Sequence, residues 1–291
     1  MRNSAFGAHA GMNRSPRIDR VVSSLRGAVP LRVPKRLRPM VSARNPGRGS
    51  TDGNWDQAAA EDALAGRQRQ AAQLLGTAAP ERSARDLLVA ALDREGDGLE
   101  RRGWLAWVAY LGYYPTEAEV RALARLLRRS GGEGVAVELE SRHRHRVTHC
   151  CASLDCLDLL EGVPLIDVTH TLTSDLNTGI QRVTREVGAR WIARGGVGVA
   201  YDDVAGCVRR LDDAQRHQVR SWADGPDSAP PVPPASHGIA VPWGATLVMP
   251  ELVVDPARTA AYRGLAIAHV LQTMSLIGYD MVPVVAAETV E

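Results

Sequence analysis

The residues best placed to do chemistry follow a short apolar segment in the second half of the chain. Residues 163–169 read VPLIDVT, an apolar, β-branched run that predicts a buried strand. A polar loop, 170–178, follows and ends in Asn177 and Thr178, next to Gly179. A helix starting there would present unpaired N–H groups and its positive dipole end, and Gly179 would let a ligand approach the backbone. This arrangement indicates phosphate binding, although the chain has neither a GxGxxG nor a GxxxxGKS/T pattern.

The residues after Gly179 predict the helix itself. Apolar residues recur there at three- and four-residue steps, which is typical of a helix that packs on a sheet. They are Ile180, Val183, Val187 and Trp191. We therefore expect this apolar stripe to face the sheet.

The remainder of this half alternates predicted strands and helices. Strands are expected at 197–201, 207–211, 246–252 and 275–279, and helices at 212–222 and from Asp255-Pro256 to about Val270. A long loop is expected at 225–244, which is rich in proline and serine. The order predicts an α/β fold with a parallel, doubly wound sheet and right-handed crossovers. Its ligands would lie beyond the carboxyl ends of the strands, near the 170–182 loop, Glu251 and Asp280.

Three patches in this half resemble the N-terminal domain of bacterial family-four glycosyltransferases. They are residues 167–172 with 177–183, then 249–252, then 277–284, in the order found in that family. The resemblance covers about residues 163–291. It implies a Rossmann-like, parallel-sheet, N-terminal half of a GT-B glycosyltransferase, which retains anomeric configuration when it transfers a hexose from a nucleotide sugar.

The resemblance also implies roles for the residues of the glycine loop. The loop would lie against the donor diphosphate, where negative charge grows during transfer. Gly179 and Ile180 would offer backbone N–H groups, Asn177 and Thr178 belong to the same loop, and Arg182 is a candidate phosphate partner. The structural alternative for Gly179 is a plain helix start.

Three further residues are expected to contact substrates. Asp280 is the candidate catalytic acid of the cleft, although Tyr279 precedes it where relatives often have histidine. His170 and Glu251 are candidate substrate-binding residues. The alternatives are a strand-end cap for Asp280 and a hydrogen-bond acceptor at the sheet edge for Glu251.

The family's donor domain, with its paired glutamates, has no counterpart in the eleven residues after Asp280. We therefore expect a truncated glycosyltransferase that cannot complete transfer alone, with its donor domain on a separate polypeptide as one alternative. The partners would be a nucleotide-sugar donor and an acceptor glycan or lipid, without a further cofactor. The competing interpretation is a non-catalytic binding or regulatory module. A dehydrogenase is disfavoured because the glycine fingerprint is missing.

Composition and charge set the wider frame. The net charge is only +2, but residues 1–50 hold eleven basic residues against the single acid Asp19. They predict a disordered basic leader, with a transit peptide or a nucleic-acid-binding arm as alternatives; no nucleic-acid motif supports the last. No apolar run is long enough to cross a membrane, and the four cysteines do not make a disulfide framework. These features predict a cytoplasmic protein.

The region between leader and sheet is expected to be helical from 55 to 142. Helices are predicted at 56–75, 81–93, 99–111 and from Pro115 to Gly131-Gly132. Trp104, Trp107 and Tyr110 are expected to pack in a core, with a sugar-stacking platform as the alternative. Residues 143–162 are expected to be a linker that precedes the 163–291 domain. The nearby His143, His145, His149, Cys150, Cys151 and Cys156 suit zinc by type but not by spacing.

Overall fold

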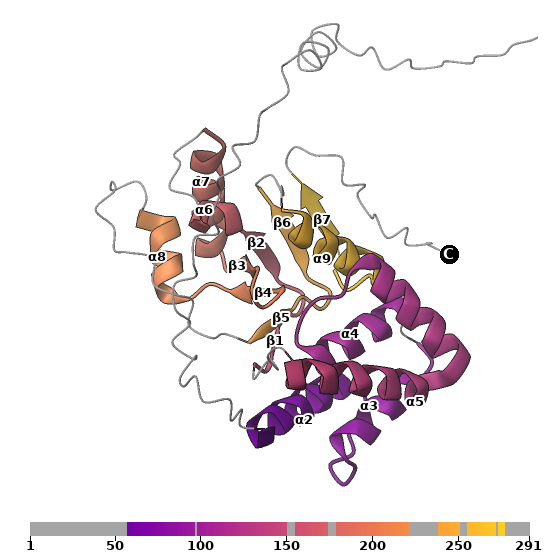
Figure 1. Cartoon of the computed structure of the whole chain (residues 1–291). Helices are drawn as coiled ribbons and strands as arrows, with labels where there is room; N and C mark the ends of the chain where they lie inside the picture. Colours follow the sequence, from indigo (N-terminus) through magenta and orange to yellow (C-terminus); the bar gives the residue numbers. More distant parts are fainter. Residues whose placement is uncertain are drawn as a thin grey trace, which may run out of the picture. The chain divides into compact units, whose positions relative to one another are not determined.

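The computed structural model describes residues 57–96, 98–149, 155–173, 179–221, 238–250, 255–271 and 273–276. All of them belong to one unit, Ser50–Glu291. The predicted basic leader lies outside the described residues. Figure 1 shows the order of the helices and strands.

The helices of the N-terminal half begin close to where the sequence predicts them, although the helix expected from residue 81 starts only at Ala84. They are α2 (Gln57–Leu74), α3 (Ala84–Leu92), α4 (Leu99–Leu111) and α5 (Glu117–His149). The start of α5 is a capping box, because the backbone N–H of Thr116 donates to Glu119 at 2.8 Å and the backbone N–H of Glu119 donates to the Thr116 hydroxyl at 3.4 Å. The left-handed Gly112 follows the end of α4, with φ of 73°.

Helix α5 does not end at Gly131-Gly132 as predicted. Gly131 has a φ of 63°, which interrupts the helix, and the N–H of Gly132 donates to the Asp93 carboxylate at 2.5 Å. The chain then resumes helical geometry as far as His149. The first part of the expected linker, 143–162, is therefore helical, and His143 within it is buried.

The aromatic residues of α4 form core rather than a sugar platform. Trp104, Trp107 and Tyr110 are at most 1% exposed. The Trp104 ring also lies 5.2 Å from the Tyr114 ring, centroid to centroid. This confirms the packing interpretation of the cluster, since rings this deeply buried cannot stack on a sugar.

A five-stranded sheet has the order β4-β3-β2-β6-β7. Its strands are β2 (Pro164–Asp167), β3 (Val197–Asp202), β4 (Cys207–Arg210), β6 (Thr246–Met249) and β7 (Thr273–Leu276). Neighbouring strands are parallel except β4, which pairs antiparallel with β3. The mixed α/β class and the mostly parallel sheet agree with the prediction.

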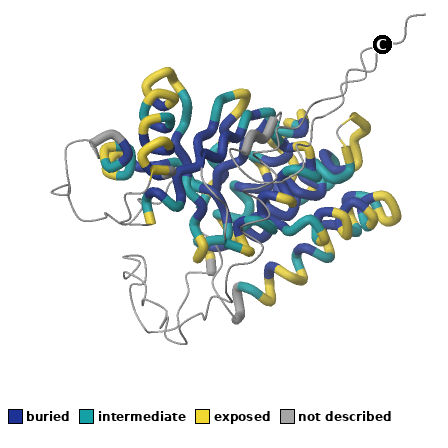
Figure 2. Tube along the Cα trace, turned by 90° about the horizontal axis from the view of Figure 1, so that it is seen from above, coloured by how far each residue is buried: buried dark blue, intermediate teal, exposed yellow. Residues whose placement is uncertain are grey.

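Helices cover both faces of this sheet. Because the side chains of a strand alternate between its faces, neighbouring residues of one strand belong to different cores. Ile166 of β2 and Val168, directly after it, pack with Ile192 of α7 (Gly179–Ala193) and Val219 of α8 (Asp213–Ser221). Leu165 belongs to the other, larger core, which includes residues of α9 (Pro256–Ile267) and of α2 to α5. Figure 2 shows these buried strands and helix faces in dark blue. The helical region and one face of the sheet thus share one core, which differs from the expected separation of residues 55–142 and 163–291.

Two short strands were not predicted. Strand β1 (Leu157–Leu159) lies in the expected linker and β5 (Ile239–Val241) in the expected long loop, and they pair in parallel. Helix α2 contacts β1 through Gln70, whose side-chain amide accepts from the N–H of Leu157 at 3.0 Å and donates to its carbonyl at 3.3 Å.

Among the described residues, none of the helices combines the length and apolar character needed to cross a membrane.

Candidate functional site

The chain changes direction across the sheet beside β2. Helices α6 (Thr169–Thr173) and α7 connect β2 to β3 on one side, whereas β6 pairs with β2 on the other side. In open parallel sheets, the connections diverge at such a point and leave a place for ligands beyond the carboxyl ends. The residues that border this place are Asp167, at the end of β2, and Pro250, directly after β6.

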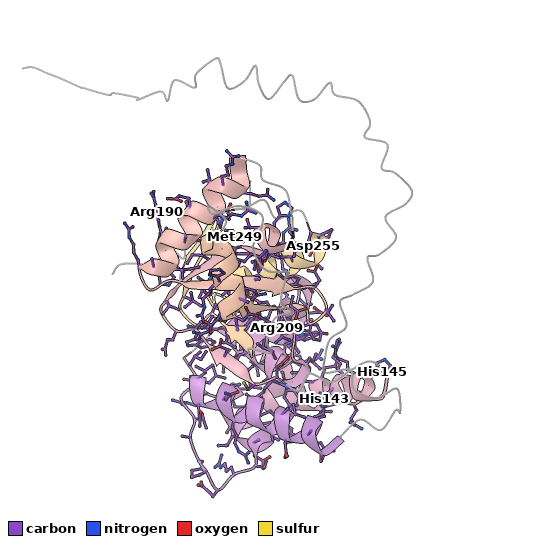
Figure 3. All side chains as sticks on the ribbon, turned by 90° about the vertical axis from the view of Figure 1, so that its left-hand side faces the viewer. His143, His145, Arg190, Arg209, Met249 and Asp255 are labelled. Carbon is purple, nitrogen blue, oxygen red and sulfur yellow. The ribbon has the colours of Figure 1, made fainter. Side chains whose placement is uncertain are left out.

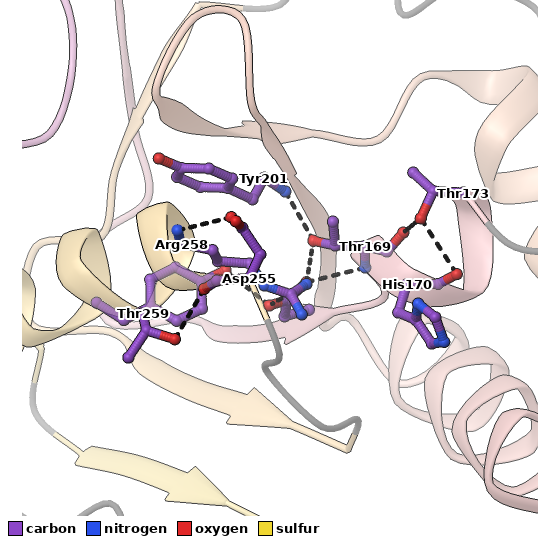
Figure 4. A network of polar contacts seen from close by, with 9 residues as sticks. Thr169, His170, Thr173, Tyr201, Asp255, Arg258 and Thr259 are labelled. Atoms are coloured by element: carbon purple, nitrogen blue, oxygen red, sulfur yellow. Dashed lines mark hydrogen bonds and ion pairs between the residues drawn. The ribbon is translucent and has the colours of Figure 1, made fainter. Parts of the chain in front are cut away.

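Asp167 is the centre of a buried polar network, and Figure 4 labels its neighbours Thr169, Tyr201 and Arg258. One carboxylate oxygen accepts from the backbone N–H of Thr169 at 2.9 Å and also from the Thr169 hydroxyl. The other oxygen accepts from the Tyr262 hydroxyl at 2.6 Å and lies 3.7 Å from the Arg258 guanidinium. The carboxylate is thus held from its own loop and from α9. Such charge-assisted contacts offset the cost of burying it.

The partners of Asp167 are themselves fixed. Burial, together with the charge of Asp167, raises the pKa of Tyr262 well above its usual value, so its hydroxyl keeps its proton and donates. The Thr169 hydroxyl accepts from the backbone N–H of Tyr201 at 2.8 Å, which ties the end of β2 to β3. The loop after β2 therefore has a defined position at the edge of the sheet.

Helix α9 contributes a buried cation to this edge. Asp255 caps the helix by accepting from the N–H groups of Ala257 at 3.3 Å and Arg258 at 2.8 Å. Arg258 is only 3% exposed, because its side chain turns inward toward Asp167. The predicted Asp255-Pro256 helix start is confirmed, and it positions this arginine.

Helix α7 contributes a second buried cation from the opposite face of the sheet. Arg185 is 4% exposed, and Gln181 and Thr184 on the same side of the helix are also buried. The Thr184 hydroxyl donates to the carbonyl of Pro250 at 3.4 Å, which joins α7 to the end of β6. Arg185 and Arg258 thus come from two helices that both begin at the carboxyl edge of the sheet, where their dipoles are positive.

The predicted apolar stripe of α7 does not face the sheet, and this prediction is wrong. Val183 is 54% exposed and Trp191 is 39% exposed. The inward side instead carries Gln181, Thr184, Arg185, Gly188 and Ile192. Gly188 lies there because the helix is close to the strand: an added Cβ would be 3.4 Å from Val168.

The structure places part of the predicted glycine loop. Gly179 and Ile180 open α7, and Arg182 lies exposed in its first turn. Gly179 is exposed, and a Cβ added to it would meet nothing within 4 Å, so a ligand can reach this backbone. His170 is half-buried on α6, a short helix inside the segment predicted to be a loop. Asn177, Thr178, Glu251 and Asp280 lie outside the described residues.

Sequence reasoning missed the four residues that form the buried part of the site, namely Asp167, Arg185, Arg258 and Tyr262. A carboxylate at the end of an apolar strand was an available signal for Asp167. Arg185 was missed because the apolar stripe was taken as the inner face of α7. Only packing reveals the roles of Arg258 and Tyr262.

The residues considered for zinc do not meet in the described part of the chain. His143 is buried toward Arg67 and Tyr110, whereas His145 is exposed. Among described residues, no group of three or more histidine, cysteine, aspartate or glutamate side chains is placed to hold a metal ion. Cys150 and Cys151 are not among these residues.

Comparison with known proteins identifies no relative: no family model, curated protein or solved structure matches this chain.

Proposed function

We propose that the edge between β2 and β6 binds the diphosphate of a nucleotide sugar, as part of a glycosyltransferase similar to family four. The observation that supports this is the pair of buried arginines, Arg185 and Arg258, on two helices that begin at this edge. Positive charge held at such a position stabilises a leaving diphosphate, because its negative charge grows as the glycosidic bond breaks. The open backbone at Gly179 gives the phosphate an approach.

In this proposal, the exposed and buried residues have different tasks. The first turn of α7, with Gly179, Ile180 and Arg182, contacts the diphosphate. Arg185 and Arg258 lie deeper and contribute positive charge from inside the protein, although Asp167, 3.7 Å from Arg258, balances part of the charge of that arginine. Asp280 remains the proposed catalytic acid, and His170 and Glu251 the proposed contacts to the acceptor or sugar.

One observation favours a second candidate, a binding module without chemistry. Both oxygens of Asp167 already accept hydrogen bonds. This carboxylate is also buried, so it positions the loop after β2 and does not meet a substrate. Ligand binding without turnover would be the outcome expected of such a module.

Calorimetric titration with UDP, GDP and their sugars tests the proposal. The unmodified chain is expected to bind at least one of these nucleotides, and Gly179→Trp is expected to weaken this binding at least about tenfold by filling the approach. Gly66→Trp is the matched control, because Gly66 is a helical glycine of α2 whose added Cβ also meets nothing within 4 Å. Circular dichroism verifies that both variants fold.

Two results would count against the proposal: no binding across the panel, or equal binding by Gly179→Trp and the unmodified chain. Recognition of the sugar separates the two candidates, because this chain is not expected to complete transfer alone. A preference for the nucleotide sugar over the free nucleotide that is lost in Asp280→Asn supports the enzyme, whereas equal binding of both by the unmodified chain supports the module.

A further inference from the structure

The outward side of α7 carries a continuous apolar line. Val183, Val187 and Trp191 follow one another at four-residue steps, so their side chains are neighbours on one side of the helix. Val183 and Trp191 are exposed and Val187 is half-buried. Single exposed apolar residues are ordinary, but a row of three on one helix marks a surface that contacts something.

Charged residues next to this line are mostly basic. Arg182, Arg190 and Arg194 are exposed, and Glu186 is the one acid among the exposed residues from Gly179 to Arg194. Glu186 is paired with Arg190 at 2.6 Å, one helical turn apart. Figure 3 shows Arg190 on the outer side of α7. We call these residues the outer face of α7: Val183, Glu186, Val187, Arg190, Trp191 and Arg194.

We propose that the outer face of α7 binds the surface of an anionic lipid membrane. A helix with an apolar line beside basic residues lies in the plane of the lipid head groups and inserts its apolar side chains between them. Tryptophan favours this boundary, because its ring is apolar and its N–H can remain hydrated. The arginines face the lipid phosphates, which attract each nearby basic residue.

The size of the surface favours lipid over a second copy of the chain. Helix α7 has 15 residues, so its length is only about 22 Å at 1.5 Å per residue. One line of three side chains is far smaller than the roughly 800 Å² per partner that a stable protein interface buries. Insertion among lipids needs no complementary protein surface. This inference does not depend on the proposed nucleotide site.

Helix α5 supplies matched controls for the test. Val137 is 54% exposed, the same fraction as Val183, but its neighbours on α5 include the exposed Glu133 and the half-buried Glu138 rather than exposed apolar residues. Arg142 pairs with Glu138 at 2.7 Å and four-residue spacing, as Arg190 pairs with Glu186. The substitutions of Val183 and Arg190 therefore each have a counterpart with the same exposure or the same kind of ion pair.

The experiment is flotation of the full chain with vesicles of phosphatidylcholine alone or mixed equally with phosphatidylglycerol. Because residues 1–50 are strongly basic and can add background binding, variants are compared within the full chain. We expect Val183→Asp to weaken binding to the anionic vesicles about tenfold, and Val137→Asp to leave it unchanged. Arg190→Gln is expected to weaken it about fivefold, and Arg142→Gln not at all.

Fluorescence quenching by brominated lipids provides a second measurement. Anionic brominated vesicles are expected to quench part of the tryptophan emission of the unmodified chain, and Trp191→Phe should remove most of that quenched part. Equal flotation of Val183→Asp and Val137→Asp, or equal quenching in Trp191→Phe, would overturn the proposal. A dimer that forms without lipid and is lost in Val183→Asp would overturn it in favour of self-association.

Discussion

Helices α4 and α7 belong to the cores on the two faces of the sheet, yet they bury opposite kinds of residues. Every residue of α4 from Gly103 to Leu111 is buried, and almost all are apolar or small. Helix α7 buries glutamine, threonine and arginine, and exposes valine and tryptophan. The comparison indicates that α4 stabilises the fold by burying apolar side chains. The inner side of α7 instead places polar side chains near the edge of the sheet beside Asp167.

The largest test of this comparison replaces one tryptophan in each helix with alanine. Trp104→Ala removes a fully buried ring and should lower the free energy of unfolding by about 3–5 kcal/mol. Trp191→Ala removes a ring that is 39% exposed and should lower it by only about 1–2 kcal/mol. Urea unfolding followed by circular dichroism measures both. A cost for Trp191 similar to that for Trp104 would show that α7 is packed as the sequence pattern predicts.

A second test compares glycines on the two faces. A Cβ at Gly264 of α9 would overlap the carbonyl oxygen of Pro115, a backbone atom that cannot move aside. Gly264→Ala should therefore cost about 3 kcal/mol, the upper end of ordinary overpacking. Gly188→Ala on α7 makes only ordinary contacts, at 3.4 Å or more. It should change stability by less than about 1 kcal/mol, with helix propensity favouring alanine. Thermal unfolding of both variants tests whether the larger core is the tighter one.

A third test compares two buried tyrosines whose hydroxyls donate to acceptors of different charge. The Tyr262 hydroxyl donates to the Asp167 carboxylate, whereas the Tyr114 hydroxyl donates to the backbone carbonyl of Ala240. Because a bond to a charged group contributes more, Tyr262→Phe should cost about 1.5–3 kcal/mol and Tyr114→Phe about 0.5–1.5 kcal/mol. Equal costs in chemical unfolding would mean that Asp167 does not depend on Tyr262.

The smallest effect concerns pH on the helical side. Burial, and then the charge of Arg67, lower the pKa of His143 from its usual 6.5. Below about pH 6.5 the unfolded chain binds a proton that the folded chain resists, so stability should fall as the pH decreases. His143→Gln should reduce this slope by at most about 1.4 kcal/mol per pH unit. Unfolding curves between pH 5 and 7 measure it, and an unchanged slope would refute the assignment.

Local signals were sufficient to predict much of the fold. The Asp255-Pro256 cap, the bounds of α4 and the apolar β-branched runs of β2 and β3 each depend on neighbouring residues. Strands β1 and β5 were missed because each has three residues and forms only through its distant partner.

The candidate site was less predictable for two physical reasons. Periodicity locates an apolar stripe on α7, but it does not determine whether that stripe faces the sheet or the solvent. The contact between Asp167 and Tyr262 joins residues 95 positions apart, so no local pattern contains it. What the sequence did indicate was the edge of the sheet at which these residues meet.

The contact between Gln70 and β1 has a consequence for how the protein avoids misassembly. The end of a sheet normally offers free N–H and C=O groups to any extended chain, and thereby promotes aggregation. The Gln70 amide satisfies both groups of Leu157, and Arg67 donates to the carbonyl of Asp155 at 2.9 Å. Helix α2 therefore covers backbone groups at the edge of β1. Removing α2 should yield a chain that forms intermolecular sheets rather than a smaller soluble domain.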